Sequence, residues 1–212
     1  MTINNGKLIL KFYSDFIWPF CYIAERASLA KLEEEFDIEI EWHGFELHPE
    51  TPKGGMELAL LHPNQKSDMG SYIQKFAARF GINDMAQTTR LPNTRRALAM
   101  AEYARDQRKL TEFRSRTMNA HWQEGKDIED TAILRSLVVG SGLDPEKALM
   151  AADDPAYLKR VDDTRHEFKK VGTGGIPTFI FGTEIVEGCA PYENLAAAAR
   201  HAGAKPKSQP QK

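Results

Sequence analysis

The chain has 212 residues, of which 42% are hydrophobic, 27% charged and 9% aromatic, the ordinary composition of a globular domain. Its 28 Lys and Arg residues are balanced by 30 Asp and Glu residues, and the resulting net charge of −2 argues against nucleic acid as a partner. No apolar stretch approaches the roughly 18 residues that a membrane span needs, and the first residues lack the pattern of a secretion signal. We therefore expect a cytoplasmic protein that binds neither nucleic acid nor membrane.

The first zone, residues 1–54, carries strand and helix signals in turn. Residues 8–15 form an apolar, β-prone run that predicts a buried strand. Pro19 suits the first turn of a helix, and apolar residues then recur at helical spacing as far as Phe36. Over residues 38–47 apolar and polar side chains alternate, which predicts a half-buried strand. The order strand, helix, strand predicts a right-handed unit with parallel strands.

The second zone, residues 55–170, predicts helix nearly throughout. Asp144 followed by Pro145 is an N-cap with a proline at the first helical position, and Gly81, Gly125 and Gly142 suit helix ends. No strand signal interrupts this zone, so we predict an all-helical insertion. Its helices are expected at residues 69–80, 94–108, 111–124, 130–140, 144–152 and 155–171.

The third zone, residues 171–204, returns to strand signals. Residues 176–181 and 184–187 predict a hairpin, and residues 192–201 predict a last helix. The tail at 205–212 has no apolar side chain to anchor it and is expected to be disordered. The order of elements predicts an α/β protein of thioredoxin-like fold, whose discontinuous core, 1–54 and 171–204, is interrupted by the large helical insertion at 55–170.

A first candidate site is Ser14-Asp-Phe-Ile-Trp-Pro-Phe-Cys-Tyr22, at the junction of the first predicted strand and helix. This places Trp18 at the mouth of the helix and Cys21 one turn inside. The unpaired amides and the positive dipole at that mouth stabilise an anion, such as a thiolate or the sulfur of glutathione. The alternative is that Cys21 is a small buried hydrophobe and Trp18 a capping aromatic, and a single cysteine by itself favours that alternative.

A second candidate site is the segment Gly172-Thr-Gly-Gly-Ile-Pro177 at the start of the predicted hairpin. An X-Pro bond is the only peptide bond that adopts the cis form at modest cost. A cis Pro177 would turn the amide and carbonyl of Ile176 outward, where they could pair with an extended peptide or with glutathione. An ordinary trans proline that opens a strand is the more frequent case for the dipeptide alone.

These two segments resemble the DsbA-like thioredoxin superfamily, in the branch of FrnE-like oxidoreductases, 2-hydroxychromene-2-carboxylate isomerases and kappa-class glutathione transferases. SDFIWPFCYI resembles the family's SDxxCPWCYIG, and GTGGIPTFIFG resembles its cis-proline strand. The segments EWHGFELHPETPKGG, Asn93-Thr-Arg-Arg-Ala and AHWQEGKDIED resemble further signatures in the same order, so the similarity covers about residues 8–202.

The resemblance implies a catalytic site at Cys21, Trp18 and Pro177, with substrate-binding positions at Phe20, Asn93, Ile176, Gly188 and Cys189. The oxidoreductases of this branch use a first cysteine as nucleophile and a second as the resolving thiol, whereas this chain has Trp18 at the first position. Indole cannot attack a disulfide, so a two-thiol cycle within the motif is unavailable. The isomerases and transferases place serine there and a Ser-Asp pair after the last hairpin, where this chain has Gly188-Cys-Ala-Pro191.

Three functions remain open. The first in rank is an oxidoreductase of the DsbA and FrnE type that uses Cys21 as its one motif thiol, with glutathione or Cys189 as the second sulfur. The second is a glutathione-dependent isomerase or transferase that acts on an aromatic or hydrophobic substrate. The third is a non-catalytic relative that binds a peptide or a small hydrophobic ligand. No tightly bound cofactor is expected, glutathione is the candidate cosubstrate, and the resemblance implies a homodimer.

The remaining polar residues give weaker signals. Asn93 precedes a predicted helix and is by default an N-cap. The histidines form no metal-binding pattern, so no metal site is expected, and each is interpreted as a core or solvated residue. They are His43, His48, His62, His121, His166 and His201.

Overall fold

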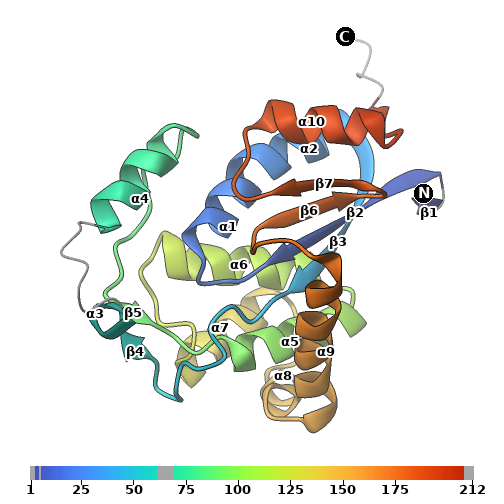
Figure 1. Cartoon of the computed structure of the whole chain (residues 1–212). Coiled ribbons are helices and arrows are strands. Elements are labelled where there is room, and N and C mark those ends of the chain that lie inside the picture. Colours follow the sequence, from blue (N-terminus) through green and yellow to red (C-terminus); the bar gives the residue numbers. More distant parts are fainter. Residues whose placement is uncertain (1–2, 5, 62–68, 208–212) are drawn as a thin grey trace.

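The computed structural model describes residues 3–4, 6–61 and 69–207, and its centre is a mixed β-sheet (Figure 1). The strands follow the order β7-β6-β2-β3-β8, and β1 pairs with β2 off this path. They are β1 (Ile3–Asn4), β2 (Lys7–Ser14), β3 (Phe36–Gly44), β6 (Thr178–Phe181), β7 (Glu184–Glu187) and β8 (Lys205–Pro206).

Strand β2 forms the middle of this sheet. It pairs in parallel with β3, where Leu10 lies opposite Ile40, and antiparallel with β6, where Phe12 lies opposite Phe179. Leu10 and Phe12 are fully buried, as strand alternation predicts, and the Phe12 and Phe179 rings stack at 4.6 Å between centroids. The parallel β2–β3 pair and the β6–β7 hairpin are the arrangement expected from the sequence.

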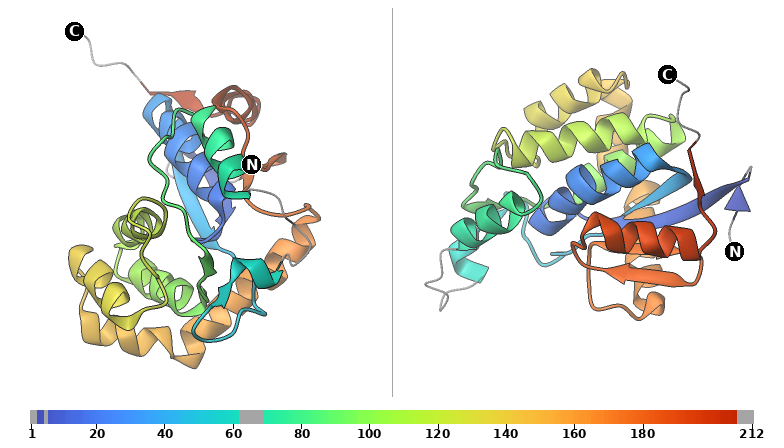
Figure 2. Two further views of the ribbon diagram at one scale, coloured as in Figure 1. Left: turned by 90° about the vertical axis from the view of Figure 1, so that its left-hand side faces the viewer. Right: turned by 90° about the horizontal axis from the view of Figure 1, so that it is seen from above.

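The connection between β2 and β3 is one helical segment in three parts. It consists of α1 (Pro19–Ala24), a π-helical turn at Glu25–Leu29 and α2 (Ala30–Glu35). This segment lies beside α10 (Tyr192–His201). In Figure 1, α2 and α10 lie above the sheet and α1 lies to the left of the strands. The helices of residues 95–171 lie away from α10, at the bottom of Figure 1 and of the left-hand view in Figure 2, whereas the helix at 69–78 stands apart at the left of Figure 1.

All six helices expected in the insertion are present, each within two residues of its predicted ends. Asp130 and Asp144 cap their helices through side-chain oxygens that accept backbone N–H groups, and Gly172 closes the last helix with a left-handed φ of 77°. A single turn, α3 (Leu58–Leu61), precedes them. The six are α4 (Met69–Ala78), α5 (Arg95–Asp106), α6 (Leu110–Trp122), α7 (Thr131–Gly140), α8 (Pro145–Ala152) and α9 (Pro155–Val171).

Two expectations need correction. The insertion is not all helical, because β4 (Met56–Glu57) pairs antiparallel with β5 (Arg90–Leu91). Two-residue strands are too short to produce an alternating pattern in the sequence. The tail is also not disordered from residue 205, because β8 pairs with the start of β3 and the Lys207 N–H donates to the Glu35 carbonyl at 2.8 Å. These are backbone bonds, so they need no apolar side chain; residues 208–212 lie outside the described residues.

Among the helices of the described residues, none combines the length and the apolar character needed to cross a membrane.

Candidate functional site

Trp18 caps the helix that follows β2. Its backbone is extended, at φ −91° and ψ 114°, and its carbonyl accepts the first helical bond from the Cys21 N–H at 3.0 Å. Pro19 follows at the first helical position, where its missing N–H costs no hydrogen bond. The partly buried Trp18 ring lies 5.3 Å from the ring of Phe20 between centroids. Trp18 therefore occupies the helix mouth, and Cys21 lies one turn inside, as predicted.

Cys21 is fully buried, with no exposed surface, and it is a free thiol. Burial raises the pKa of the Cys21 thiol well above its ordinary value, and the nearby polar groups of Ser14 and Asp15 oppose this only in part. The reactive form of cysteine is the thiolate. The structure therefore places Cys21 in the core and gives no support to the expectation that it acts as an accessible nucleophile.

The Ile176–Pro177 peptide bond is cis. Thr178 lies opposite Tyr13 in the sheet, so Pro177 lies at the end of β6 that adjoins the chain running from β2 to Trp18. The Pro177 carbonyl accepts the Gly188 N–H at 2.7 Å. Within the described part of the chain, no backbone bond uses the amide or the carbonyl of Ile176. These two groups remain available to a ligand backbone.

Gly188 and Cys189 form the turn from β7 into the last helix. Gly188 adopts a left-handed φ of 75°, and its carbonyl accepts the Ala190 N–H at 2.9 Å. Cys189 is half-buried and free, and burial raises the pKa of its thiol to about 12. The two cysteines form no disulfide with each other, as predicted. At neutral pH neither is poised to supply a thiolate.

Asn93 joins the loop after β3 to the segment before α5. Its side-chain oxygen accepts the Arg95 N–H at 3.0 Å, and its side-chain amide donates to the Thr51 carbonyl at 2.6 Å. Its own backbone N–H donates to Glu129 at 3.0 Å. The N-cap of α5 is Thr94, so the prediction for Asn93 was wrong by one residue, although Asn93 does accept the N–H of the first helical residue. Asn93 is not among the residues that line the cavity beside Trp18.

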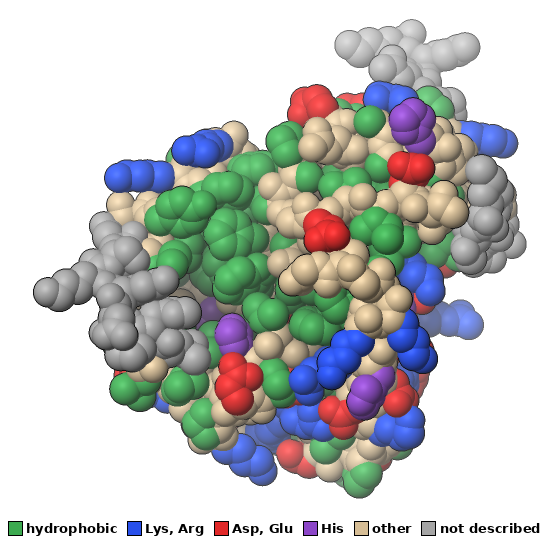
Figure 3. All heavy atoms as spheres, viewed as in Figure 1, with side chains coloured by type: hydrophobic (Ala, Val, Ile, Leu, Met, Phe, Trp, Pro, Cys, Tyr) green, Lys and Arg blue, Asp and Glu red, His purple; other side chains and the backbone are tan. Residues whose placement is uncertain are grey.

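A cavity of about 670 Å³ opens beside Trp18. It lies between the start of α1, the helices α3 and α4, the segment at 85–91 and the end of α6. Trp18 and Phe20 form an aromatic wall, and Phe20 packs edge-on against Phe76 of α4 at 5.0 Å between centroids. Hydrophobic side chains gather on this face of the molecule (Figure 3). The volume and the apolar lining are typical of a small-molecule site.

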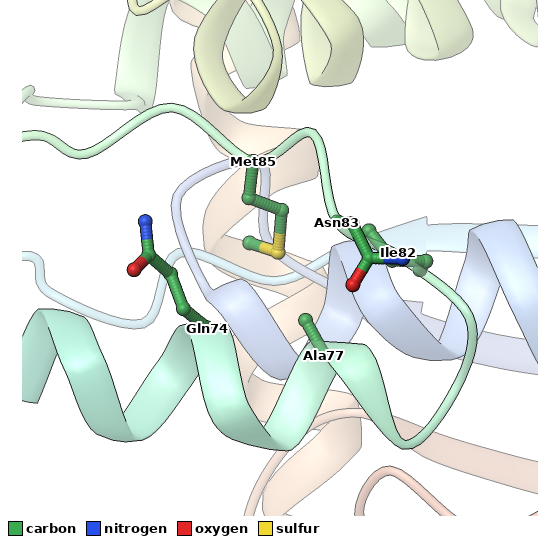
Figure 4. Close-up of a pocket in the computed structure, with 5 residues that line it drawn as sticks. All are labelled: Gln74, Ala77, Ile82, Asn83 and Met85. Atoms are coloured by element: carbon green, nitrogen blue, oxygen red, sulfur yellow. The ribbon is translucent and has the colours of Figure 1, made fainter.

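A second, smaller cavity adjoins the first. It measures about 260 Å³ and lies between α4 and the segment that follows it (Figure 4). Gln74 and Met85 line both cavities, and the Met85 side chain points toward α4 in Figure 4. Methionine is flexible and fills irregular space, so a change of the Met85 rotamer could close or open the passage between the two cavities.

Asp15 is a buried acid below the helix mouth that sequence reasoning did not single out. Its carboxylate accepts the Leu47 N–H at 2.8 Å and lies 3.5 Å from the Thr94 hydroxyl, and its second oxygen has no partner among the described residues. Burial raises the pKa of Asp15 to about 7. Asp15 thus links the end of β2, the loop after β3 and the start of α5 beneath the site.

His121 is a second residue that the sequence did not reveal. It is only 3% exposed, yet it lines the cavity from the last turn of α6. It belongs to no motif of paired histidines, so spacing gave no signal. No cluster within the described residues could hold a metal ion.

Comparison with known proteins places this chain in a family. A family model described as the DSBA-like thioredoxin domain matches residues 9–200. The uncharacterized protein YwbO of Bacillus subtilis (strain 168) is 27% identical over 183 residues, which cover 85% of this chain and 90% of YwbO.

Solved structures share the fold at lower identity. The probable DsbA oxidoreductase SCO1869 from Streptomyces coelicolor has a TM-score of 0.81 at 22% identity, over 97% of this chain and 93% of that one. A 2-hydroxychromene-2-carboxylate isomerase has a TM-score of 0.68 at 21% identity, over 92% and 95%. The cytosolic disulfide reductase DsbM from Pseudomonas aeruginosa with GSH has a TM-score of 0.65 at 17% identity, over 92% and 98%. With the family model matching most of its length, the chain belongs to the DsbA-like thioredoxin domain family.

Proposed function

We propose that this protein is a glutathione-dependent enzyme of the isomerase or transferase type, which acts on a small apolar substrate. The observation that carries the proposal is the cavity beside Trp18, in a site where the protein offers no reachable thiolate. An apolar substrate matches the lining, since its transfer from water to an apolar site is favourable by about 0.8 kcal/mol per buried CH₂ group.

Glutathione would supply the sulfur that the chain lacks. Its peptide backbone would pair with the free amide and carbonyl of Ile176, beside cis Pro177, in the manner of an added strand. Its thiol would then point toward Trp18, where relatives that perform thiol exchange carry a cysteine. Two proteins of similar fold support the proposal that glutathione binds here: one is a 2-hydroxychromene-2-carboxylate isomerase, and another is a disulfide reductase whose structure contains GSH.

The binding part of the proposal is tested by isothermal titration with glutathione and with S-hexylglutathione. The hexyl arm should enter the cavity, so S-hexylglutathione should bind at least about tenfold more tightly than glutathione. Ile73→Gln, in the wall of the cavity, should remove most of this advantage. Ile185→Gln is the matched control, because Ile185 is 45% exposed on β7 and lies outside the cavity. Absence of saturable binding, or an equal affinity for both ligands, would contradict the proposal.

The catalytic part is tested with 1-chloro-2,4-dinitrobenzene, a small aromatic electrophile. In the transferase reaction the glutathione sulfur forms a bond to the ring carbon, chloride leaves and the thiol proton is released. The protein should accelerate this conjugation, and Cys21→Ser should leave the rate unchanged, because the buried thiol takes no part in the reaction.

A thiol-disulfide oxidoreductase that works with one cysteine is the second candidate. Membership of the DsbA-like family and the likeness to SCO1869 favour it. Reduction of insulin with dithiothreitol separates the two candidates. Activity of the wild type that disappears in Cys21→Ser would favour the thiol enzyme.

A further inference from the structure

His121 has a defined protonation pattern. Its Nδ1 lies 3.2 Å from the Lys126 carbonyl oxygen, and a carbonyl can only accept a hydrogen bond. Nδ1 therefore carries the ring proton, and Nε2 keeps a lone pair. Burial lowers the pKa of His121, so the ring is neutral at pH 7. Trp122 packs edge-on against the ring at 4.7 Å between centroids and helps to fix its position.

The free Nε2 belongs to the surface of the cavity. It has no hydrogen-bond partner within the described residues, and it is not among the side-chain atoms that are both unpaired and sealed from solvent. The residue lines the cavity and is otherwise buried. A hydrogen-bond acceptor with these properties faces an apolar space, where an unmet bond is costly.

Three other polar groups of the lining are bonded to the protein. Glu57 is paired with Arg90 at 3.0 Å, and His48 is paired with Glu50 at 2.8 Å. The indole N–H of Trp122 donates to the Phe16 carbonyl at 2.8 Å. These groups are engaged with the protein, whereas the acceptor of His121 is open to a ligand.

We propose that Nε2 of His121 accepts a hydrogen bond from a hydroxyl group on the ligand, so that the cavity selects aromatic molecules that carry a phenol or enol. This inference rests on the proposed function and deepens it by naming the class of substrate. The aromatic part packs against Trp18 and Phe20, and the hydroxyl points to the end of α6. His121 acts here as a residue that determines specificity.

The test compares 1-naphthol with 1-methoxynaphthalene, which has a similar shape but no hydroxyl donor. Isothermal titration of the wild-type protein should show that 1-naphthol binds roughly threefold to tenfold more tightly, the range for one net hydrogen bond. His121→Asn should abolish this preference, because its amide nitrogen replaces Nδ1 on the Lys126 carbonyl and nothing replaces Nε2. His121→Gln places an amide at the position of Nε2, so it should restore part of the preference.

The outcomes separate this inference from the proposed function. If wild type binds both probes with equal affinity, or if His121→Asn keeps the full preference, the proposed hydrogen bond of His121 is wrong, but the proposal of an apolar binding cavity is unaffected. If wild type binds neither probe, both the inference and the proposed apolar site are wrong. The wild-type comparison needs no variant, and thermal unfolding of the two variants checks that each is folded.

Discussion

Trp18 decides what chemistry the helix mouth can perform. In relatives with a two-cysteine motif, the residue at this position attacks the disulfide, and the second cysteine lies one turn inside the helix. In this chain the inner cysteine, Cys21, is fully buried, and the residue at the helix mouth is Trp18. Indole is no nucleophile toward sulfur, so Trp18 supplies part of a cavity wall and no reacting group.

Trp18→Cys should create disulfide reductase activity. The helix mouth would lower the pKa of the new thiol from its reference of about 8.5, and Cys21 would serve as the resolving thiol. We expect insulin reduction at least about tenfold faster than by wild type, measured by turbidity at equal protein concentration. Trp18→Ser is the control, because it opens the same space without a thiol. A wild type as active as Trp18→Cys would show that a competent thiol route does not use position 18.

The buried acid Asp15 should make stability depend on pH. Burial holds the pKa of Asp15 at about 7 in the folded protein, against 3.8 when it is exposed. From about pH 4 to about pH 7 the folded state therefore keeps a proton that the unfolded state releases, and stability falls as the pH rises. The loss is complete above about pH 7 and amounts to about 4 kcal/mol.

Asp15→Asn should remove this dependence, since asparagine does not titrate and its oxygen still accepts the Leu47 N–H. Urea unfolding of both proteins at about pH 4 and about pH 7.5 measures it. Between these two values the free energy of unfolding should fall more in wild type than in Asp15→Asn, by up to about 4 kcal/mol. Equal falls in the two proteins would mean that Asp15 titrates normally.

The Glu129 side chain joins two of the loops that border the cavity. One oxygen of Glu129 accepts the Gly54 N–H at 2.6 Å, and the other accepts the Asn93 N–H at 3.0 Å. These bonds fix the loop before β4 and the segment after β5, whose pairing places Glu57 and Leu91 in the cavity wall. Glu129 thus connects the start of α7 to one side of the site.

Glu129→Ala should lower the free energy of unfolding by about 1–3 kcal/mol, since two backbone donors lose a charged acceptor. It should also weaken binding of S-hexylglutathione, because the wall of the cavity loses its support. Glu146→Ala is the matched control: within the described residues the Glu146 carboxylate pairs only with Arg135, and its side chain is 71% exposed, so little effect is expected. Urea unfolding and titration of both variants check this. Equal effects of the two substitutions would contradict the claim that Glu129 supports the cavity wall.

Across the whole molecule, the elements with a regular sequence pattern were predicted, whereas those that form only through tertiary contacts were not. The periodic spacing of apolar residues predicted where the long helices lie, and the alternation of apolar and polar residues predicted the strands. Asp144 followed by Pro145 predicted the start of a helix. The β4–β5 pair and β8 depend on backbone bonds between distant residues, which leave no periodic signal. They therefore appeared only in the structure.

The candidate site divides in the same way. The positions of Trp18 and Cys21 were predictable from the strand and helix signals around them. The cis bond at Pro177 followed from the resemblance of its segment to the cis-proline strand of the family, because the dipeptide alone favours trans. The cavity was not predictable, since its walls come from α1, α4, α6 and the segment at 85–91. The role of His121 was not predictable either, because it depends on packing: the Lys126 carbonyl engages Nδ1, and the fold places the residue in the cavity lining.

We propose that the helix mouth and the cis-proline strand form one binding site for glutathione with an apolar arm. Amide chemical shifts of the ¹⁵N-labelled protein, followed during titration with S-hexylglutathione, test this site. We expect saturable shifts at Trp18, Phe20 and Ile176 together with residues of the cavity wall such as Ile73. Shifts that do not saturate, or that leave Trp18 and Ile176 unchanged, would contradict it.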